Sequence, residues 1–212
     1  MYTGSFKNDK KQGQGISYHK NGFKNYSGNF YNDLMDGFGY LYDRNGNLKY
    51  TGNFRQNLKD GDGKYYFYNK TLCYEGSYKD DKRSGYGDLY DFSGRLIYCG
   101  NFENDMKQGS GISYGALTGS VTYKGNFYKD ARNGYGTVYN SAGLSEAKNK
   151  ECLNQLKAKN ALGEKYTRLN GWMNTFLNWT NNFDEDQEDR LLDGNFKDNL
   201  LTKVFKHYRK NF

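Results

Sequence analysis

A five-residue motif, aromatic-x-Gly-x-aromatic, recurs along the first two thirds of the chain. It always begins with tyrosine, and successive copies start 24 residues apart, with one step of 25. A Gly-x-Gly motif begins eleven residues after each of these tyrosines, and a further tyrosine closes each copy. Self-similarity at a fixed period of about 20–50 residues is typical of repeat proteins, in which each copy packs against its neighbours. The chain is therefore interpreted as an array of six copies.

Each copy contributes one tyrosine to each of two rows. The first tyrosine row opens the copies and consists of Tyr2, Tyr26, Tyr50, Tyr74, Tyr98 and Tyr123. The second tyrosine row closes them and consists of Tyr18, Tyr42, Tyr66, Tyr90, Tyr114 and Tyr139.

The spacing within each copy predicts β-strands joined by tight turns. Tyrosine, glycine and the second aromatic residue alternate with other residues, so they share one face of a strand. A polar pair follows, such as Asn8-Asp9, and Asn and Asp tolerate the left-handed backbone of a two-residue hairpin turn. A second turn is expected near Asn21-Gly22 in the first copy. Two turns in each copy predict one long antiparallel meander.

The turn position also predicts how the strands pair. If Asn8-Asp9 is a two-residue turn, Gly4 lies opposite Gly13 and Tyr2 lies opposite Gly15. Each tyrosine ring can then lie over a glycine of the neighbouring strand. A glycine weakens a strand, and a covering aromatic ring is a known way to offset that loss.

The composition supports an aromatic core. Hydrophobic residues make up only 35% of the chain and the mean hydropathy is −1.06, which taken alone would suggest disorder. Aromatic residues, however, make up 18% of the chain and recur at fixed positions in the repeat. Because each ring buries a large apolar area, the pattern predicts a folded array with a thin aromatic core.

The repeat pattern ends at Gly143, and helical spacing takes over. We expect a helical segment at 144–183, an acidic linker at 184–190, and a degenerate final repeat strand with a basic tail at 191–212. Gly163 is expected to divide the helical segment into two helices. One apolar stripe at three-to-four spacing consists of Tyr166, Leu169, Trp172, Met173, Phe176 and Leu177.

The unit Y-x-G-x-F, turn, G-x-G, turn resembles the MORN (membrane occupation and recognition nexus) repeat, and six copies cover residues 2–143. The copies differ from the usual pattern in being 24 rather than 23 residues long. They also have Asp or Asn where that family commonly has Gly in the first turn. The resemblance implies an all-β repeat fold, an elongated and twisted antiparallel meander of hairpins with a groove, here followed by the C-terminal α-helical segment.

The resemblance further implies a non-catalytic scaffold, or a module attached to a separate enzyme domain, and no such domain is recognised in residues 144–212. We therefore expect a cytoplasmic protein of a cytoskeletal, ciliary or cortical assembly that binds other proteins.

No catalytic, cofactor or metal site is predicted. The Gly-x-Gly pairs are expected inside strands, whereas a phosphate-binding loop lies between a strand and a helix. The acidic run 184–189 has Asp189 at the position where a calcium loop requires glycine. With only His19 and His207, and no Cys-x-x-Cys motif, neither a zinc site nor a histidine-dependent triad can be assembled.

Cysteine content and net charge restrict the expected cellular compartment and the expected class of partner. The three cysteines, and the lack of a long apolar run or a signal peptide, lead us to expect a reduced, intracellular protein. Cys73 and Cys99 lie about one repeat apart, which is too far for a disulfide between them. The net charge of +7 is spread along the chain, so a nucleic-acid partner is not expected.

Both tyrosine rows are candidate lining of a partner-binding groove. An amphipathic helix at 164–181 is predicted to fill that groove, to cap the array, or to bind in trans, and an open groove would accept a helix from another protein. Self-association remains open. The alternative function is peripheral binding to anionic, phosphoinositide-containing membranes. It ranks second because charges along the edge formed by the first turns alternate in sign.

Overall fold

The computed structural model describes residues 1–139 and 190–207. Every regular element in these residues is a β-strand. In chain order the strands are β1 (Tyr2–Lys7), β2 (Lys10–Tyr18), β3 (Lys24–Tyr31), β4 (Leu34–Tyr42), β5 (Leu48–Arg55), β6 (Leu58–Tyr66), β7 (Leu72–Lys79), β8 (Lys82–Tyr90), β9 (Leu96–Glu103), β10 (Met106–Tyr114), β11 (Val121–Tyr128), β12 (Ala131–Tyr139), β13 (Arg190–Lys197) and β14 (Leu200–His207).

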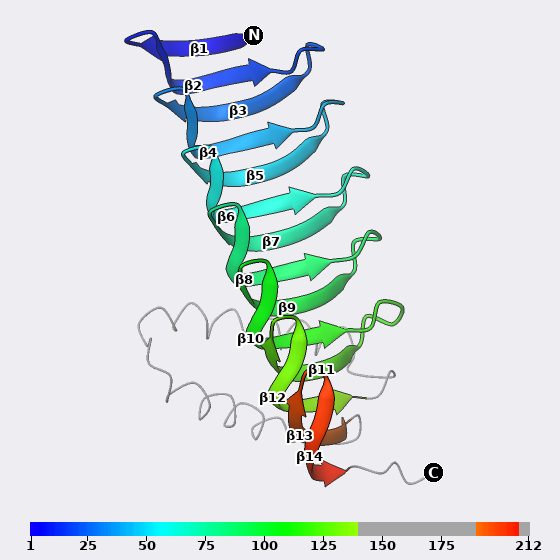
Figure 1. The fold of residues 1–212 in the computed structure, drawn as a ribbon. Helices are drawn as coiled ribbons and strands as arrows, with labels where there is room; N and C mark the ends of the chain where they lie inside the picture. Colours follow the sequence, from blue (N-terminus) through cyan, green and yellow to red (C-terminus); the bar gives the residue numbers. More distant parts are fainter. Residues whose placement is uncertain (140–189, 208–212) are drawn as a thin grey trace. The chain divides into compact units, whose positions relative to one another are not determined.

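The strands follow one another in the sheet in chain order, and every pairing reported for them is antiparallel. The predicted meander is therefore confirmed. The chain divides into two compact units, unit 1 (Met1–Leu96 and Asn101–Met106) and unit 2 (Ile97–Gly100 and Lys107–Phe212). In unit 1 the hairpins from β1 to β8 succeed one another, each with its short turn on one side and its longer loop on the other (Figure 1).

The polar pairs form the short turns, as predicted. Asn8 and Asp9 have φ angles of 52° and 58°, and Lys7 pairs with Lys10 across the turn. Two successive left-handed residues define a type I′ turn, whose twist matches that of the flanking strands. The same conformation recurs at Asn32-Asp33, Gln56-Asn57, Asp80-Asp81, Asn104-Asp105, Lys129-Asp130 and Asp198-Asn199.

The second turns are longer loops in which one residue is left-handed. In the first copy the His19 N–H donates to the Phe23 carbonyl over 2.8 Å, and Gly22 has a φ of 87°. Gly46 and Gly94 occupy the same place in the second and fourth copies. The third copy has Lys70 there instead, with a φ of 69°.

The predicted strand register was wrong by two residues. Gly4 pairs with Gly15, not with Gly13, and Tyr2 pairs with Ser17. The cause is an irregularity between Gly4 and Phe6, opposite which Gly13 adopts a left-handed φ of 73° and takes up additional chain in β2. The first glycine of each Gly-x-Gly motif therefore forms a bulge, and the second faces the glycine of the opening motif.

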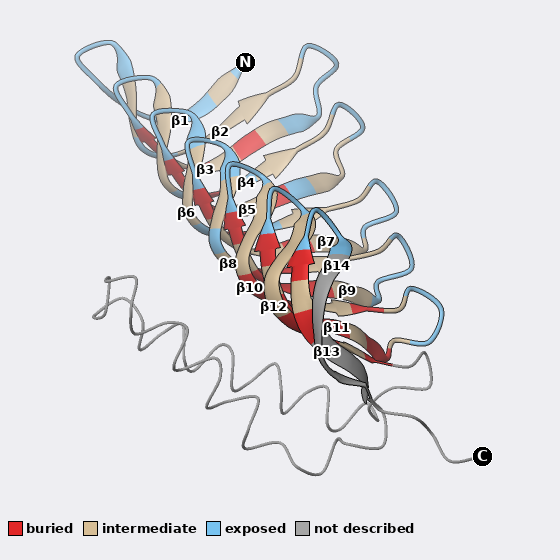
Figure 2. Ribbon diagram, turned by 60° about the horizontal axis from the view of Figure 1, so that its bottom comes forward, coloured by how far each residue is buried: buried red, intermediate tan, exposed pale blue. Residues whose placement is uncertain are grey.

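The prediction that tyrosine rings lie over glycines is confirmed. A Cβ atom added to Gly4 or Gly15 would collide with the Tyr2 ring. The same holds for Gly39 under Tyr26 and Gly63 under Tyr50. Buried segments recur at equivalent places along these strands (Figure 2). The core is therefore a row of rings lying on glycines.

Unit 2 contains a hairpin from the C-terminal part of the chain. β13 pairs with β12, with Gly136 opposite Gly194, and β14 pairs with β13. The segment predicted to form one degenerate strand thus forms two strands. The predicted helical segment at 144–183 and the acidic run at 184–189 lie outside the described residues.

Candidate functional site

In each unit the rings of the opening strands form a continuous row, which we call the aromatic column. Neighbouring rings meet edge to face, with centroids 5.0–5.4 Å apart. Edge-to-face contacts add about 0.5–1.5 kcal/mol per pair beyond the apolar area they bury. In unit 1 the order is Phe6, Tyr2, Phe30, Tyr26, Phe54, Tyr50, Tyr78, Tyr74 and Phe102, and in unit 2 it is Tyr98, Phe127, Tyr123 and Phe196.

The phenols of Tyr2, Tyr26, Tyr50, Tyr74 and Tyr123 each donate a hydrogen bond to a carbonyl of their own strand. The Tyr50 hydroxyl donates to the Asn53 carbonyl over 3.1 Å, and Tyr26 and Tyr123 make equivalent bonds to the carbonyls three residues on. Such a bond requires the ring to fold back over its own strand, where Gly52 leaves room for it. Burial raises the pKa of the Tyr50 phenol well above its usual range. These tyrosines are therefore neutral structural side chains.

A basic side chain covers the column at most junctions between copies. The Lys59 Nζ atom lies 5.0 Å from the centroid of the Tyr78 ring and 5.8 Å from that of Tyr50. The Lys59 backbone N–H also donates to Asp81 Oδ1 over 2.9 Å, and the Asp81 N–H donates to the Lys59 carbonyl over 2.9 Å. The Asp81 carboxylate lies 3.5 Å from Nζ. Lys59 and Asp81 thus link two copies by hydrogen bonds and by an ion pair, and Lys59 also makes a cation–π contact with Tyr78.

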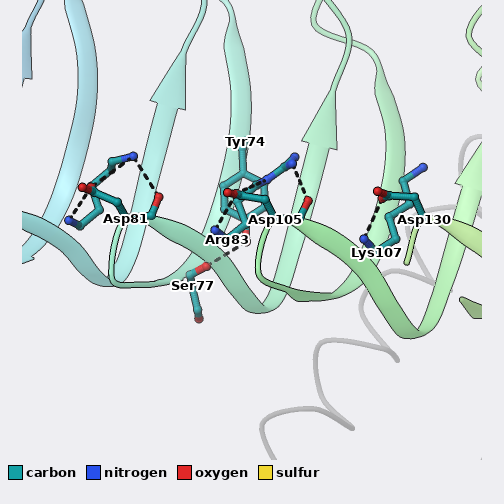
Figure 3. A network of polar contacts seen from close by, with 8 residues as sticks. Tyr74, Ser77, Asp81, Arg83, Asp105, Lys107 and Asp130 are labelled. Carbon is teal, nitrogen blue, oxygen red and sulfur yellow. Dashed lines mark hydrogen bonds and ion pairs between the residues drawn. The ribbon is translucent and has the colours of Figure 1, made fainter. Parts of the chain in front are cut away.

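This reciprocal pair recurs through the array. Figure 3 shows Arg83 bound to Asp105 beside Tyr74. An ion pair is not required for this contact, because the neutral Met35 pairs with Asn57 and Arg132 pairs with the neutral Asn199. The full set is Lys11 with Asp33, Met35 with Asn57, Lys59 with Asp81, Arg83 with Asp105, Lys107 with Asp130 and Arg132 with Asn199.

These pairs, which we call the turn ladder, were not predicted from the sequence. Its members lie 22 or 23 residues apart within the repeats, and 67 residues apart where the final hairpin joins. A recurring basic residue two positions after the polar pair was the available indication. The turn ladder also explains why Asp or Asn occupies the second turn position, because a glycine has no side-chain oxygen to accept the backbone N–H of the preceding copy.

The expectation that the first tyrosine row lines an open groove needs correction. Tyr26, Tyr50, Tyr98 and Tyr123 have no exposed surface, and Tyr74 is 1% exposed. Their rings lie on glycines and are flanked by the column. The row therefore forms the core rather than an accessible surface.

The second tyrosine row is placed differently in the two units. Tyr18, Tyr42, Tyr66 and Tyr90 in unit 1 are half-buried, so part of each side chain remains accessible. In unit 2, Tyr114 and Tyr139 are buried.

Half-buried leucines continue this surface. Tyr42 pairs with Leu48, and Tyr66 pairs with Leu72. We call the six residues of unit 1 the second-row stripe: Tyr18, Tyr42, Leu48, Tyr66, Leu72 and Tyr90.

The longer loops of unit 1 carry exposed aromatic rings. Phe23 is 52% exposed and Tyr68 is 79% exposed. Tyr68 and Phe67 both contact Phe92, with centroids 5.0 Å and 5.4 Å apart. We call these four residues the loop aromatics. Basic residues occur in or beside the same loops, at Lys20, Lys24, Arg44, Lys70 and Arg95.

The acidic residues of these loops are occupied in shaping the turns. The Ser93 hydroxyl donates to the Asp91 carboxylate, and so does the Arg95 backbone N–H. These hydrogen bonds, that from Ser93 most of all, lower the pKa of Asp91 to about 2. In the second copy the backbone N–H of Asn47 and that of Asn45 donate to Asp43 and lower its pKa. Both carboxylates therefore stay ionised to low pH.

Several further expectations can be compared with the structure. Cys73 and Cys99 are not joined by a disulfide, as the repeat spacing predicted. Within residues 1–139 and 190–207, no group of three or more His, Cys, Asp or Glu side chains is placed to hold a metal ion. No helix long and apolar enough to cross a membrane occurs there. The predicted helical stripe, Tyr166, Leu169, Trp172, Met173, Phe176 and Leu177, lies outside the described residues.

Comparison with known proteins identifies the repeat. The model of the family described as MORN repeat matches six segments, which together make up more than half of the chain. Every match begins at a tyrosine of the first row, so the sequence family and the folded unit share one boundary. The matched residues are 2–23, 26–48, 50–71, 74–94, 98–116 and 123–143. A comparison with curated proteins gave no match.

Proposed function

Because this chain belongs to the MORN repeat family, we propose that it is a non-enzymatic scaffold that binds other proteins through the second-row stripe. The supporting observation is the difference between the two tyrosine rows. The first row is used in the core, whereas Tyr18, Tyr42, Tyr66 and Tyr90 keep part of each ring accessible at one position per repeat. Tyrosine suits such a surface, because its ring gives apolar contact and its hydroxyl tolerates water.

The repeat spacing favours a helical partner. Successive second-row tyrosines lie two strands apart, which at about 4.8 Å per strand amounts to nearly 10 Å. A helix rises about 1.5 Å per residue, so residues seven apart are separated by about 10.5 Å. A helix lying across the strands can therefore offer one apolar residue to each repeat. The expected partner carries apolar anchors at i, i+7 and i+14.

The proposed cellular setting rests on the family alone. Scaffolds of this kind suit cytoskeletal, ciliary or cortical assemblies, and we place this chain in such an assembly in the cytoplasm. The uncharged apolar stripe and the satisfied turn carboxylates support protein contact rather than chemistry.

Capture of partners from native lysate tests this proposal. The double variant Tyr42→Glu, Tyr66→Glu places two charges on the stripe without touching the aromatic column. Proteins cross-linked to the unchanged chain should be lost from the double variant. The matched control is Phe38→Ser, which removes an exposed ring outside the stripe and should retain them. Equal capture by the double variant, with unchanged thermal melting, would contradict the proposal.

The loop aromatics favour a second candidate function, peripheral binding to anionic membranes. Exposed rings beside basic residues suit a lipid interface, where each basic residue contributes about 1 kcal/mol. Binding to vesicles of phosphatidylcholine with phosphatidylserine or phosphoinositide, measured by flotation, should fall at high salt. It should also fall in the double variant Tyr68→Ser, Phe92→Ser. Absence of flotation with the unchanged chain would exclude this second function.

A further inference from the structure

The aromatic column of unit 1 is uncovered at one end. Phe6, the first ring, is 61% exposed, whereas Phe30, Phe54 and Tyr78 at the equivalent positions are 4–6% exposed. An internal ring contacts the tyrosine of the preceding copy, and most are also covered by its basic side chain. β1 is the first strand in the sheet order, so no strand of the described residues lies on its outer side. Phe6 therefore has only one neighbour in the column, Tyr2.

The junction between β6 and β7 shows what the outer side of β1 is shaped to receive. There the Tyr78 ring lies 5.4 Å from Tyr50, and Lys59 lies over it at 5.0 Å. The Asp81 carboxylate accepts the backbone N–H of Lys59 and lies 3.5 Å from its ammonium group. The preceding copy thus supplies a ring, a cation and a backbone N–H.

The first copy carries the receiving half of the same junction. Phe6 stands where Tyr78 stands, and Asp9 stands where Asp81 stands, two residues into an identical turn. Asp9 has a φ of 58° and Asp81 has one of 68°, so both have the left-handed backbone of the ladder residues. Among the described residues, no hydrogen bond or ion pair reaches the Asp9 carboxylate.

We propose that the outer edge of β1 binds a strand of another protein that carries a basic residue, namely the closing strand of a MORN-type hairpin. Backbone groups at a sheet edge provide affinity for an added strand, and its side chains provide specificity. The basic residue lies over Phe6 and pairs with Asp9, and the ring of the incoming hairpin contacts Phe6. A strand with an apolar residue in place of the cation would offer Asp9 only a backbone N–H, as Met35 offers to Asn57, and in that internal junction the acceptor carries no charge.

This surface is separate from the second-row stripe, so the inference goes beyond the proposed function. It assigns the stripe to helices and the β1 edge to strands. A scaffold with both surfaces can hold a helical partner while joining a second repeat protein at its first strand.

A peptide taken from the chain itself provides the probe. Residues 50–66, the hairpin β5–β6, contain Tyr50, Lys59 and the Gly-x-Gly strand. The peptide is labelled with fluorescein and titrated with the full chain, and binding is followed by fluorescence anisotropy. Saturable binding is expected. The variant Asp9→Lys should weaken it at least about tenfold, because the acceptor is lost and two cations meet.

Charge exchange makes the test specific. A peptide with Lys59→Asp should bind the unchanged chain poorly and the Asp9→Lys variant better, which a general loss of folding cannot produce. Phe6→Ser should weaken binding to every peptide. Phe38→Ser is the matched control, because it removes an exposed ring of unit 1 away from β1, and it should leave binding unchanged.

Two outcomes would overturn the proposal. The first is no saturable binding of the unchanged peptide up to about 1 mM. The second is binding that Asp9→Lys and Phe6→Ser leave unaltered, which would place the peptide elsewhere. The double variant Tyr42→Glu, Tyr66→Glu should bind the peptide normally, so failure of the stripe and failure of the β1 edge are distinguishable.

Discussion

The two glycines of each Gly-x-Gly motif have different physical roles. Gly61 has a φ of 98°, so it serves backbone conformation at the bulge. Gly63 serves space, because the Tyr50 ring lies where its side chain would be. The final hairpin shows the same coupling in its sequence: Leu192 stands in place of the tyrosine, and the partner of Gly194 is Val204. Where the tyrosine is absent, the glycine of the partner strand is absent too.

Substitution of Gly87 tests this coupling. Its φ is not in the left-handed region, so a change to valine acts only by displacing the Tyr74 ring. Gly87→Val should lower the free energy of unfolding by at least about 1–3 kcal/mol, the usual cost of overpacking. The measurement is urea denaturation followed by circular dichroism. Lys82→Gln, at an exposed position, should change it by less than about 0.5 kcal/mol. Equal effects would mean that the ring does not lie on Gly87.

At the scale of elements, the short turn acts as a connector as well as a reversal. Its second residue must tolerate a left-handed backbone and also present an oxygen to the preceding copy. Asp and Asn meet both requirements, whereas glycine meets only the first. The basic residue opposite is then held over the aromatic rings, where a cation at these distances contributes about 0.5–1 kcal/mol at exposed sites.

Two substitutions of Asp81 separate the oxygen from the charge. Asp81→Asn keeps an acceptor for the Lys59 N–H and loses only a partly exposed ion pair, so it should cost less than about 1 kcal/mol. Asp81→Ala loses the acceptor and puts a residue that disfavours left-handed backbone at a φ of 68°, and should cost about 1–3 kcal/mol. Denaturation midpoints of the two variants provide the comparison. An Asn variant as unstable as the Ala variant would show that the charge dominates.

The longer loop of the third copy offers a stabilising change. Lys70 occupies a left-handed position that glycine fills in the first, second and fourth copies. Lys70→Gly should raise the free energy of unfolding by up to about 1 kcal/mol, because the strain of the side chain disappears. Lys82→Gly, inside strand β8, should have the opposite sign, since glycine weakens a strand. A fall in thermal melting temperature for Lys70→Gly would contradict this account.

At the scale of the whole molecule, stability depends on one kind of contact repeated along each unit. In each interior copy the opening tyrosine contacts the second aromatic ring of the next copy. The second aromatic ring of that same copy is contacted by the tyrosine of the copy before. Arrays of this kind gain stability from the sum of neighbouring interfaces. Because the same buried phenol recurs, a rise in pH that favours its ionisation acts on every copy at once.

High pH should therefore destabilise the fold cooperatively. Burial raises the pKa of Tyr26, Tyr50 and Tyr74 above the ordinary value of 10.0. An unfolded tyrosine ionises near pH 10, while the folded one stays protonated, so the unfolded state holds fewer protons above that pH. The stability is fully present below about pH 10 and is lost as pH rises towards the folded pKa values. Urea midpoints measured from pH 8 upwards should stay level and then fall, and a constant midpoint beyond about pH 11 would contradict the assignment.

The sequence alone determined the number of copies, the strands, both turns of each copy and the ring-over-glycine contact. These features depend on residues close together in the chain. Alternation sets a strand, and Asn or Asp pairs set a two-residue turn. The six family matches and the meander confirm that part.

Tertiary structure decided the register, the role of each tyrosine row and the turn ladder. The register differs from the prediction because Gly13 forms a bulge. The sequence alone does not show whether a glycine in a strand is needed for its backbone conformation or for the space that it leaves. Tyr26 is buried and Tyr42 only half-buried, although both recur with the same period, because the Phe54 ring of the neighbouring copy packs against Tyr26. Lys59 meets Asp81 only after two hairpins have stacked. The local sequence pattern determines the structure of each copy, and contacts between neighbouring copies determine which side chains remain accessible.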